Sequence, residues 1–212
     1  MTTKEIIVES ATKMFVSQGI KAVRMDDIAR ELSISKRTLY ELFGDKEELI
    51  YQSIKHYTQQ LKVRRDELTA NVNNPLEAMI VSLRDMIVDA PVSCRLRRNI
   101  SRFYPAVYER LEKEMQSESR NKLSQWVKVC VEQGYFTKTA DCDFVVRVLH
   151  DSAGGVIGAN NFENNDHLEQ VSMVTYSLVI FIRGLCTVEG IEVIDNCFNK
   201  YIGNLPKPKG AA

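Results

Sequence analysis

The sequence has few of the residues that build metal and redox sites. Among 212 residues there are three histidines and five cysteines. The histidines lack metal-ligand spacing with one another, and the cysteines form no CxxC pair. We therefore expect no metal and no cofactor, and we predict that the cysteines are reduced core residues. A redox switch between Cys186 and Cys197, which lie close in sequence, is the alternative.

Long apolar runs are also missing. No segment reaches 18 uninterrupted apolar residues, and residues 1–5 lack the apolar core of a signal peptide. These features predict a cytoplasmic protein without a membrane partner. The sequence has no alternating strand pattern, no internal repeat and no low-complexity run, whereas apolar residues recur at helical spacing. This periodicity predicts an all-α fold.

An excess of charge is absent as well. The chain has 28 basic and 28 acidic residues, and the first 60 residues contain nine of each. Nucleic-acid binders are often basic. Any affinity for DNA would therefore depend on the placement of a few cations and on two copies of the chain acting together.

What the sequence does contain is a helix-turn-helix pattern between Arg24 and Lys46. Asp26 and Asp27 lie where a first helix would begin, and their negative charge favours a helix N-terminus. Ser35 is suited to cap a second helix, and Gly44 is suited to end it. Apolar positions give the second helix an inward stripe, which leaves its polar side chains facing outward.

The outward side chains are of the kinds that contact DNA phosphates and base edges. We predict DNA contacts from the cations, hydroxyls and phenol in and around the second helix: Arg24, Ser35, Lys36, Arg37, Thr38, Tyr40 and Lys46. Asp45 and Glu48 are expected to form a reciprocal cap at the start of the next helix, with Lys46 at its positive end. The alternative is a three-helix packing unit with a solvated polar face.

Residues 3–50 resemble the DNA-binding domain of the TetR (tetracycline-repressor) family of bacterial transcription regulators. The resemblance rests on Ala11, Phe15, Gly19, Ile28, Ala29, residues 35–43 and residues 45–49. Two positions depart from the family pattern: Arg24 stands where Thr is usual, and Ser33 stands where Gly is usual. A left-handed Ser33 would cost about 1 kcal/mol.

This resemblance implies a particular all-α architecture. A three-helix DNA-binding domain (residues 1–46) would be joined by a long fourth helix to a ligand-binding and dimerisation domain (residues 47–205), with a flexible tail (residues 206–212). Within the second domain, Pro91 is expected to end a helix at Ala90. A separate short helix would follow over residues 92–103.

That short segment is rich in arginine. It contains Arg95, Arg97, Arg98 and Arg102. We expect these side chains to pair with acids of the first or fourth helix, and contact with DNA is the alternative.

Two helices near the C-terminus are too apolar around their circumference for the surface of a monomer. Gly154 and Gly158 lie one helical turn apart and would allow another helix to approach closely. A close contact within one subunit is the alternative, but the family resemblance favours a homodimer. The predicted interface residues are Gly154, Gly158, Leu178 and Phe181.

The resemblance also implies an effector pocket in the second domain. A pocket combines apolar walls with a few polar groups. The candidate lining residues are Met86, Phe103, Tyr108, Trp126, His150 and Asn161.

We therefore predict a homodimeric DNA-binding regulator, a repressor that a small-molecule effector releases from a palindromic operator. The sequence contains no nucleophile–base motif, so we do not expect an enzyme. The alternative is a small-molecule-binding protein or an enzyme with a vestigial helix-turn-helix.

Overall fold

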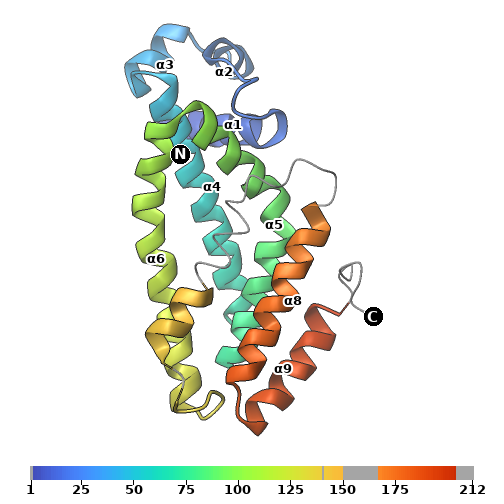
Figure 1. Cartoon of the computed structure of the whole chain (residues 1–212). Coiled ribbons are helices and arrows are strands. Elements are labelled where there is room, and N and C mark those ends of the chain that lie inside the picture. Colours follow the sequence, from blue (N-terminus) through green and yellow to red (C-terminus); the bar gives the residue numbers. More distant parts are fainter. Residues whose placement is uncertain (1, 140, 150–166, 204–212) are drawn as a thin grey trace. The chain divides into compact units, whose positions relative to one another are not determined.

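The computed structural model describes residues 2–139, 141–149 and 167–203, and every regular element within them is helical (Figure 1). The helices are α1 (Thr3–Gln18), α2 (Met25–Glu31), α3 (Lys36–Phe43), α4 (Lys46–Thr69), α5 (Pro75–Phe103), α6 (Pro105–Glu132), α8 (His167–Leu185) and α9 (Val188–Tyr201). Residues 142–149 are also helical. The predicted all-α fold is confirmed.

Local capping explains where several helices begin and end. Thr2 and Glu5 cap the start of α1 reciprocally, with the Thr2 amide donating to Glu5 Oε2 at 2.8 Å. Gly19 ends the helix with φ 88°, a conformation that glycine adopts without a steric penalty. Asn74 Oδ1 accepts from the amide of Leu76 at 2.9 Å and so caps α5, which has Pro75 as its first residue.

The prediction that Pro91 ends a helix is wrong. Helix α5 continues from Pro75 to Phe103 without interruption. A proline inside a helix removes one backbone hydrogen bond, but residues on both sides of Pro91 are anchored by burial. Ile80 is fully buried in one core cluster, and Leu96 and Ile100 are 3% and 2% exposed in another. Packing of the residues on both sides of Pro91 therefore outweighs the tendency of proline to interrupt a helix.

The chain forms two compact units, which we call unit 1 and unit 2. Unit 1 comprises Met1–Arg64 and Val92–Glu114, and unit 2 comprises Arg65–Pro91 and Met115–Ala212. Each unit has its own buried apolar cluster. Because α4, α5 and α6 each contribute to both units, the compact units are not continuous in sequence. The predicted functional boundary after residue 46 remains a prediction.

The C-terminal helices of unit 2 are tied together by a cap and an ion pair. Thr187 caps α9 by accepting from the Gly190 amide at 3.2 Å. Arg183 on α8 donates two hydrogen bonds to the Asp195 carboxylate on α9, at 2.7 and 2.9 Å. These bonds keep the pKa of Asp195 below its ordinary value.

The cysteines are free thiols, and burial governs their chemistry. Burial raises the pKa of Cys130 to about 12, and it raises the pKa of Cys186 and of Cys197 to about 11. Because the thiolate is the reactive form, these side chains are poor nucleophiles at neutral pH. This result favours core residues over a redox switch. Separately, none of the described helices has the length and apolar character needed to span a membrane.

Candidate nucleic-acid interface

A tight turn joins α2 and α3, and its geometry fits the predicted helix-turn-helix. Ser33 has φ 53°, the left-handed conformation expected at this position. Ser35 caps α3, with its hydroxyl accepting from the Thr38 amide at 3.0 Å. Leu39 is fully buried and Phe43 is 4% exposed, so these residues fix the inward face of α3. Leu42 is partly buried against the same core, whereas Lys36, Arg37, Tyr40 and Glu41 are exposed.

The outward cations of α3 form weak ion pairs with neighbouring carboxylates, and DNA phosphates can replace those carboxylates. Lys36 forms an ion pair with Asp26, and Arg37 Nε lies 2.7 Å from Glu41 Oε1. Both pairs are solvent-exposed, and such pairs contribute only about 0–1 kcal/mol. Tyr40 is 48% exposed on the same helix. These side chains can therefore leave their ion pairs and contact phosphates and base edges at a small cost in free energy.

Arg24 precedes α2 and has an exposed side chain. Its backbone amide donates to Asp27 Oδ2 at 2.9 Å, while its side chain makes no capping hydrogen bond. Asp27 thus supplies one half of a capping box. The other half is missing, because the Asp27 amide donates to the Arg24 carbonyl oxygen at 3.1 Å and not to a side-chain hydroxyl, and the guanidinium takes no part in helix capping.

Lys46 makes contacts that the sequence did not indicate. Its ammonium donates to the Ile20 carbonyl oxygen at 2.8 Å, and it lies 5.7 Å from the centre of the Tyr104 ring. The carbonyl is 26 residues away in sequence, so only the tertiary fold brings it to Lys46. Contact between Lys46 and a phosphate remains a prediction, and it would use the other ammonium protons.

The expected reciprocal cap at the start of α4 is half correct. Asp45 Oδ1 accepts from the Glu48 amide at 2.8 Å, as predicted. The Glu48 side chain does not return this bond, because its two oxygens accept from Gln52 and Arg110, each at 2.7 Å. The Asp45 amide instead donates to the Phe43 carbonyl oxygen at 2.9 Å.

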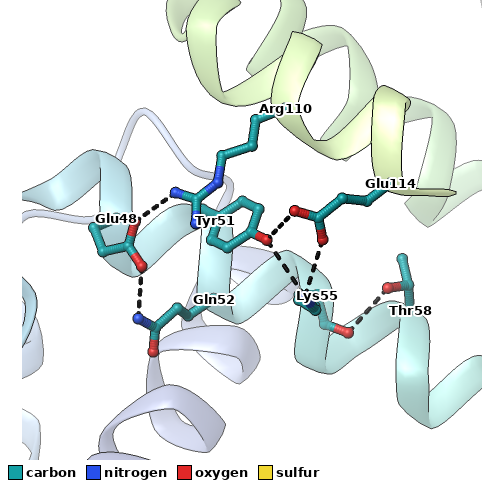
Figure 2. A network of polar contacts seen from close by, with 7 residues as sticks. All are labelled: Glu48, Tyr51, Gln52, Lys55, Thr58, Arg110 and Glu114. Atoms are coloured by element: carbon teal, nitrogen blue, oxygen red, sulfur yellow. Dashed lines mark hydrogen bonds and ion pairs between the residues drawn. The ribbon is translucent and has the colours of Figure 1, made fainter.

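Arg110 is the first member of a polar network that joins α4 to the start of α6 (Figure 2). Its guanidinium carbon lies 3.3 Å from the centre of the Tyr51 ring, a close cation–π contact. The Tyr51 hydroxyl donates to Glu114 Oε1 at 2.6 Å, and Lys55 donates to Glu114 Oε2 at 2.9 Å. The network therefore holds α6 against α4 directly beyond the helix-turn-helix, inside unit 1.

Hydrogen bonding also sets the ionisation of this network. The Tyr51 and Lys55 hydrogen bonds keep the pKa of Glu114 below its ordinary value. Burial raises the pKa of Glu48, but the bonds from Gln52 and Arg110 outweigh burial and lower that pKa overall. Both carboxylates are thus held in the charged form that the cations require.

The predicted pocket residues are divided between the two units. Met86 and Trp126 belong to unit 2, and Phe103 and Tyr108 belong to unit 1. The Tyr108 hydroxyl accepts from Arg97 at 2.8 Å, and its ring packs against the core that also holds the helix-turn-helix. The sequence could not show this division, because it falls within continuous helices.

The predicted interface residues on α8 have different environments. Leu178 is 6% exposed and belongs to the core of its own subunit, whereas Phe181 is half-buried. The adjacent Ile180 is 69% exposed and was not singled out from the sequence. His150, Asn161, Gly154 and Gly158 lie outside the described residues.

Comparisons with known proteins agree with this geometry. Residues 7–52 match the family model described as bacterial regulatory proteins, tetR family. The HTH-type transcriptional repressor KstR2 of Mycobacterium tuberculosis is 27% identical over 154 residues, which cover 69% of this chain and 75% of KstR2. The HTH-type transcriptional regulator YhgD of Bacillus subtilis is 38% identical over 64 residues, which cover 30% of this chain and 34% of YhgD.

Solved structures share the fold beyond the helix-turn-helix. A transcriptional regulator from Cytophaga hutchinsonii has a TM-score of 0.72 at 18% identity, covering 86% of this chain and 98% of its own. The structure of KstR2 from M. tuberculosis has a TM-score of 0.58 at 19% identity, covering 88% of this chain and 96% of the KstR2 chain. The family match lies on the same residues that form the capped turn and the outward face of α3. The chain belongs to the TetR family of DNA-binding bacterial transcriptional regulators.

Proposed function

We propose that this regulator is a homodimeric repressor that binds a palindromic operator through α3 and leaves it when a small molecule binds. The observation that carries the proposal is the outward face of α3. Its cations, hydroxyls and phenol stand on a helix fixed by Leu39, Phe43 and the Ser35 cap. A helix held in this way can enter a major groove without rearrangement.

Within this surface we assign two kinds of contact. Lys36 and Arg37 lie in the first turn of α3, the part of a recognition helix that reaches base edges. Arg24, Ser35, Thr38, Tyr40 and Lys46 would contact the sugar–phosphate backbone and set the register of the helix.

Dimerisation is supported by an exposed stripe on α8. Ser177, Ile180 and Gly184 are exposed at helical spacing, and an added Cβ at Gly184 would meet no atom within 4 Å. Two small residues flanking an exposed isoleucine suit close packing against a second helix. We propose that Gly154 and Gly158 extend this interface. Two copies would then place their α3 helices about 34–36 Å apart, as a palindrome requires.

The effector would bind in unit 2. Met86 and Trp126 are its candidate apolar contacts, and His150 and Asn161 are its candidate polar contacts. A 100-fold loss of operator affinity requires a coupling free energy of only about 2.7 kcal/mol. Helices α4, α5 and α6 each run from one unit into the other, so they are the elements through which such coupling would pass.

The test is selection of genomic fragments by the purified protein. Random fragments are passed over the immobilised protein, and the retained fragments are sequenced. We expect enrichment of one or a few fragments that share a palindrome. Retention without any preferred sequence would contradict the proposal and would favour the alternative, a small-molecule-binding protein or an enzyme with a vestigial helix-turn-helix.

A further inference from the structure

The two units differ in charge although the whole chain is neutral. Unit 1 contains 17 lysines and arginines against 12 aspartates and glutamates, a formal charge of +5. Unit 2 carries the opposite charge, −5. The first 60 residues are balanced, so most of the excess in unit 1 comes from the later segment that packs into it, residues 92–114.

The positive charge of this segment lies in the C-terminal part of α5. Residues 90–108 contain four arginines and no acidic residue. One of them, Arg97, is neutralised by Glu112 at 2.8 Å. Arg95 donates to the Val16 carbonyl oxygen at the end of α1, a contact that orients its guanidinium and leaves its charge in place.

Arg102 and Lys21 share one aromatic ring. The Lys21 ammonium lies 4.6 Å from the centre of the Phe103 ring, and the Arg102 guanidinium carbon lies 5.4 Å from the same centre. Both side chains are exposed, and neither forms an ion pair with a carboxylate of the described residues. These two like charges lie within about one Debye length of each other, where they repel unless an anion lies beside them.

The pair lies beside the elements that the proposed function assigns to DNA. Lys21 directly follows Ile20, whose carbonyl oxygen holds Lys46 at the start of α4. Figure 1 shows the turn between α5 and α6 alongside α1, within unit 1. A backbone that passes α3 and the start of α4 therefore comes close to Lys21.

We propose that Lys21 and Arg102, which both contact the Phe103 ring, form a second phosphate-binding cluster that contacts the DNA backbone outside the helix-turn-helix. This inference rests on the proposed function and extends it. The contact would be independent of sequence, because phosphates carry no base information. It would give unit 1 the affinity that the balanced charge of the helix-turn-helix does not provide.

The experiment measures binding of the full chain to a fluorescein-labelled duplex of random sequence by anisotropy over a series of salt concentrations. The Lys21→Gln/Arg102→Gln variant is compared with Lys128→Gln/Arg84→Gln, which removes two exposed cations from unit 2. Each lost phosphate contact should reduce the slope of log K against log salt by about 0.9. We therefore expect a reduction of about 1.8 per protomer in the first variant and little change in the second.

Two further measurements make the outcome decisive. The charge-preserving variant Lys21→Arg/Arg102→Lys should retain the wild-type slope, and circular dichroism should show that all variants are folded. An unchanged slope in a folded Lys21→Gln/Arg102→Gln variant would overturn this inference alone, provided that the wild type binds the duplex. If the wild type binds no duplex DNA at any salt concentration, both this inference and the proposed function are wrong.

Discussion

At the scale of single residues, Glu114 on α6 accepts hydrogen bonds from two side chains of α4 within the network of unit 1. Its two carboxylate oxygens accept from Tyr51 and Lys55, and Arg110 lies on the Tyr51 ring. The carboxylate must be ionised for both bonds to hold. The ionisation of this one group therefore controls the two hydrogen bonds by which Glu114 helps to hold the start of α6 against α4.

This dependence predicts a pH effect of defined sign. Because the pKa of Glu114 is lowered in the folded protein, its contribution to stability is present above the ordinary carboxylate pKa. That contribution is lost as the pH falls through the lowered value. Tyr51→Phe removes the 2.6 Å bond, so the Glu114 pKa should rise toward its ordinary value. Side-chain NMR titration measures this shift in the Glu114 pKa. Gln52→Glu is unsuitable as a control for Tyr51→Phe, because it adds a charge to the network.

Thr58→Val is a suitable control, since its hydroxyl donates to the Lys55 carbonyl oxygen at 2.9 Å, at the edge of the network and away from Glu114. The Thr58→Val variant should have the same Glu114 titration curve as the wild type. Identical Glu114 titrations in the wild type and in Tyr51→Phe would show that the tyrosine does not hold the carboxylate.

Residue-scale predictions from sequence succeeded where the partner is local. The predicted Ser35 cap and the predicted left-handed Ser33 are both found, and both follow from interactions within a few positions. The Lys46 contact could not be predicted in this way. Its acceptor is a carbonyl that only the folded unit brings near.

At the scale of elements, α5 shows the limit of local rules. Proline predicted a helix end, but buried residues on both sides of Pro91 keep the helix continuous. The four arginines after Pro91 were expected to meet acids of the first or fourth helix. Instead, Arg97 pairs with Glu112 on α6 and Arg95 donates to a backbone carbonyl of α1.

Helix α8 supports a prediction about assembly. Ile180 is 69% exposed, so Ile180→Glu should leave the folded protomer intact while it places a charge in the proposed dimer interface. We expect sedimentation to show a shift from dimer toward monomer, with operator affinity reduced as a consequence. The matched control is Val63→Glu, an exposed apolar residue on α4. A fully dimeric Ile180→Glu variant would place the interface elsewhere.

At the scale of the whole molecule, charge is distributed in a way that counting along the sequence does not show. The first 60 residues are neutral, yet the compact unit to which they belong carries +5. Most of the difference arises because the C-terminal part of α5 and the start of α6 belong to the same compact unit as the helix-turn-helix. The sequence predicted the surface of α3 from a contiguous pattern. The cluster at Lys21 and Arg102 joins residues 81 positions apart and needed the structure.

The central claim is that α3 reads DNA sequence. Its most direct test is the ratio of affinities for a selected genomic fragment and for the same fragment with its bases shuffled, at one salt concentration. We expect the wild type to prefer the selected fragment by about 1,000-fold or more. Lys36→Ala/Arg37→Ala should reduce this ratio at least about tenfold, because a specific base contact contributes about 1–3 kcal/mol. Lys21→Gln/Arg102→Gln should weaken both complexes and leave the ratio unchanged. A folded Lys36→Ala/Arg37→Ala variant with the wild-type ratio would contradict the account.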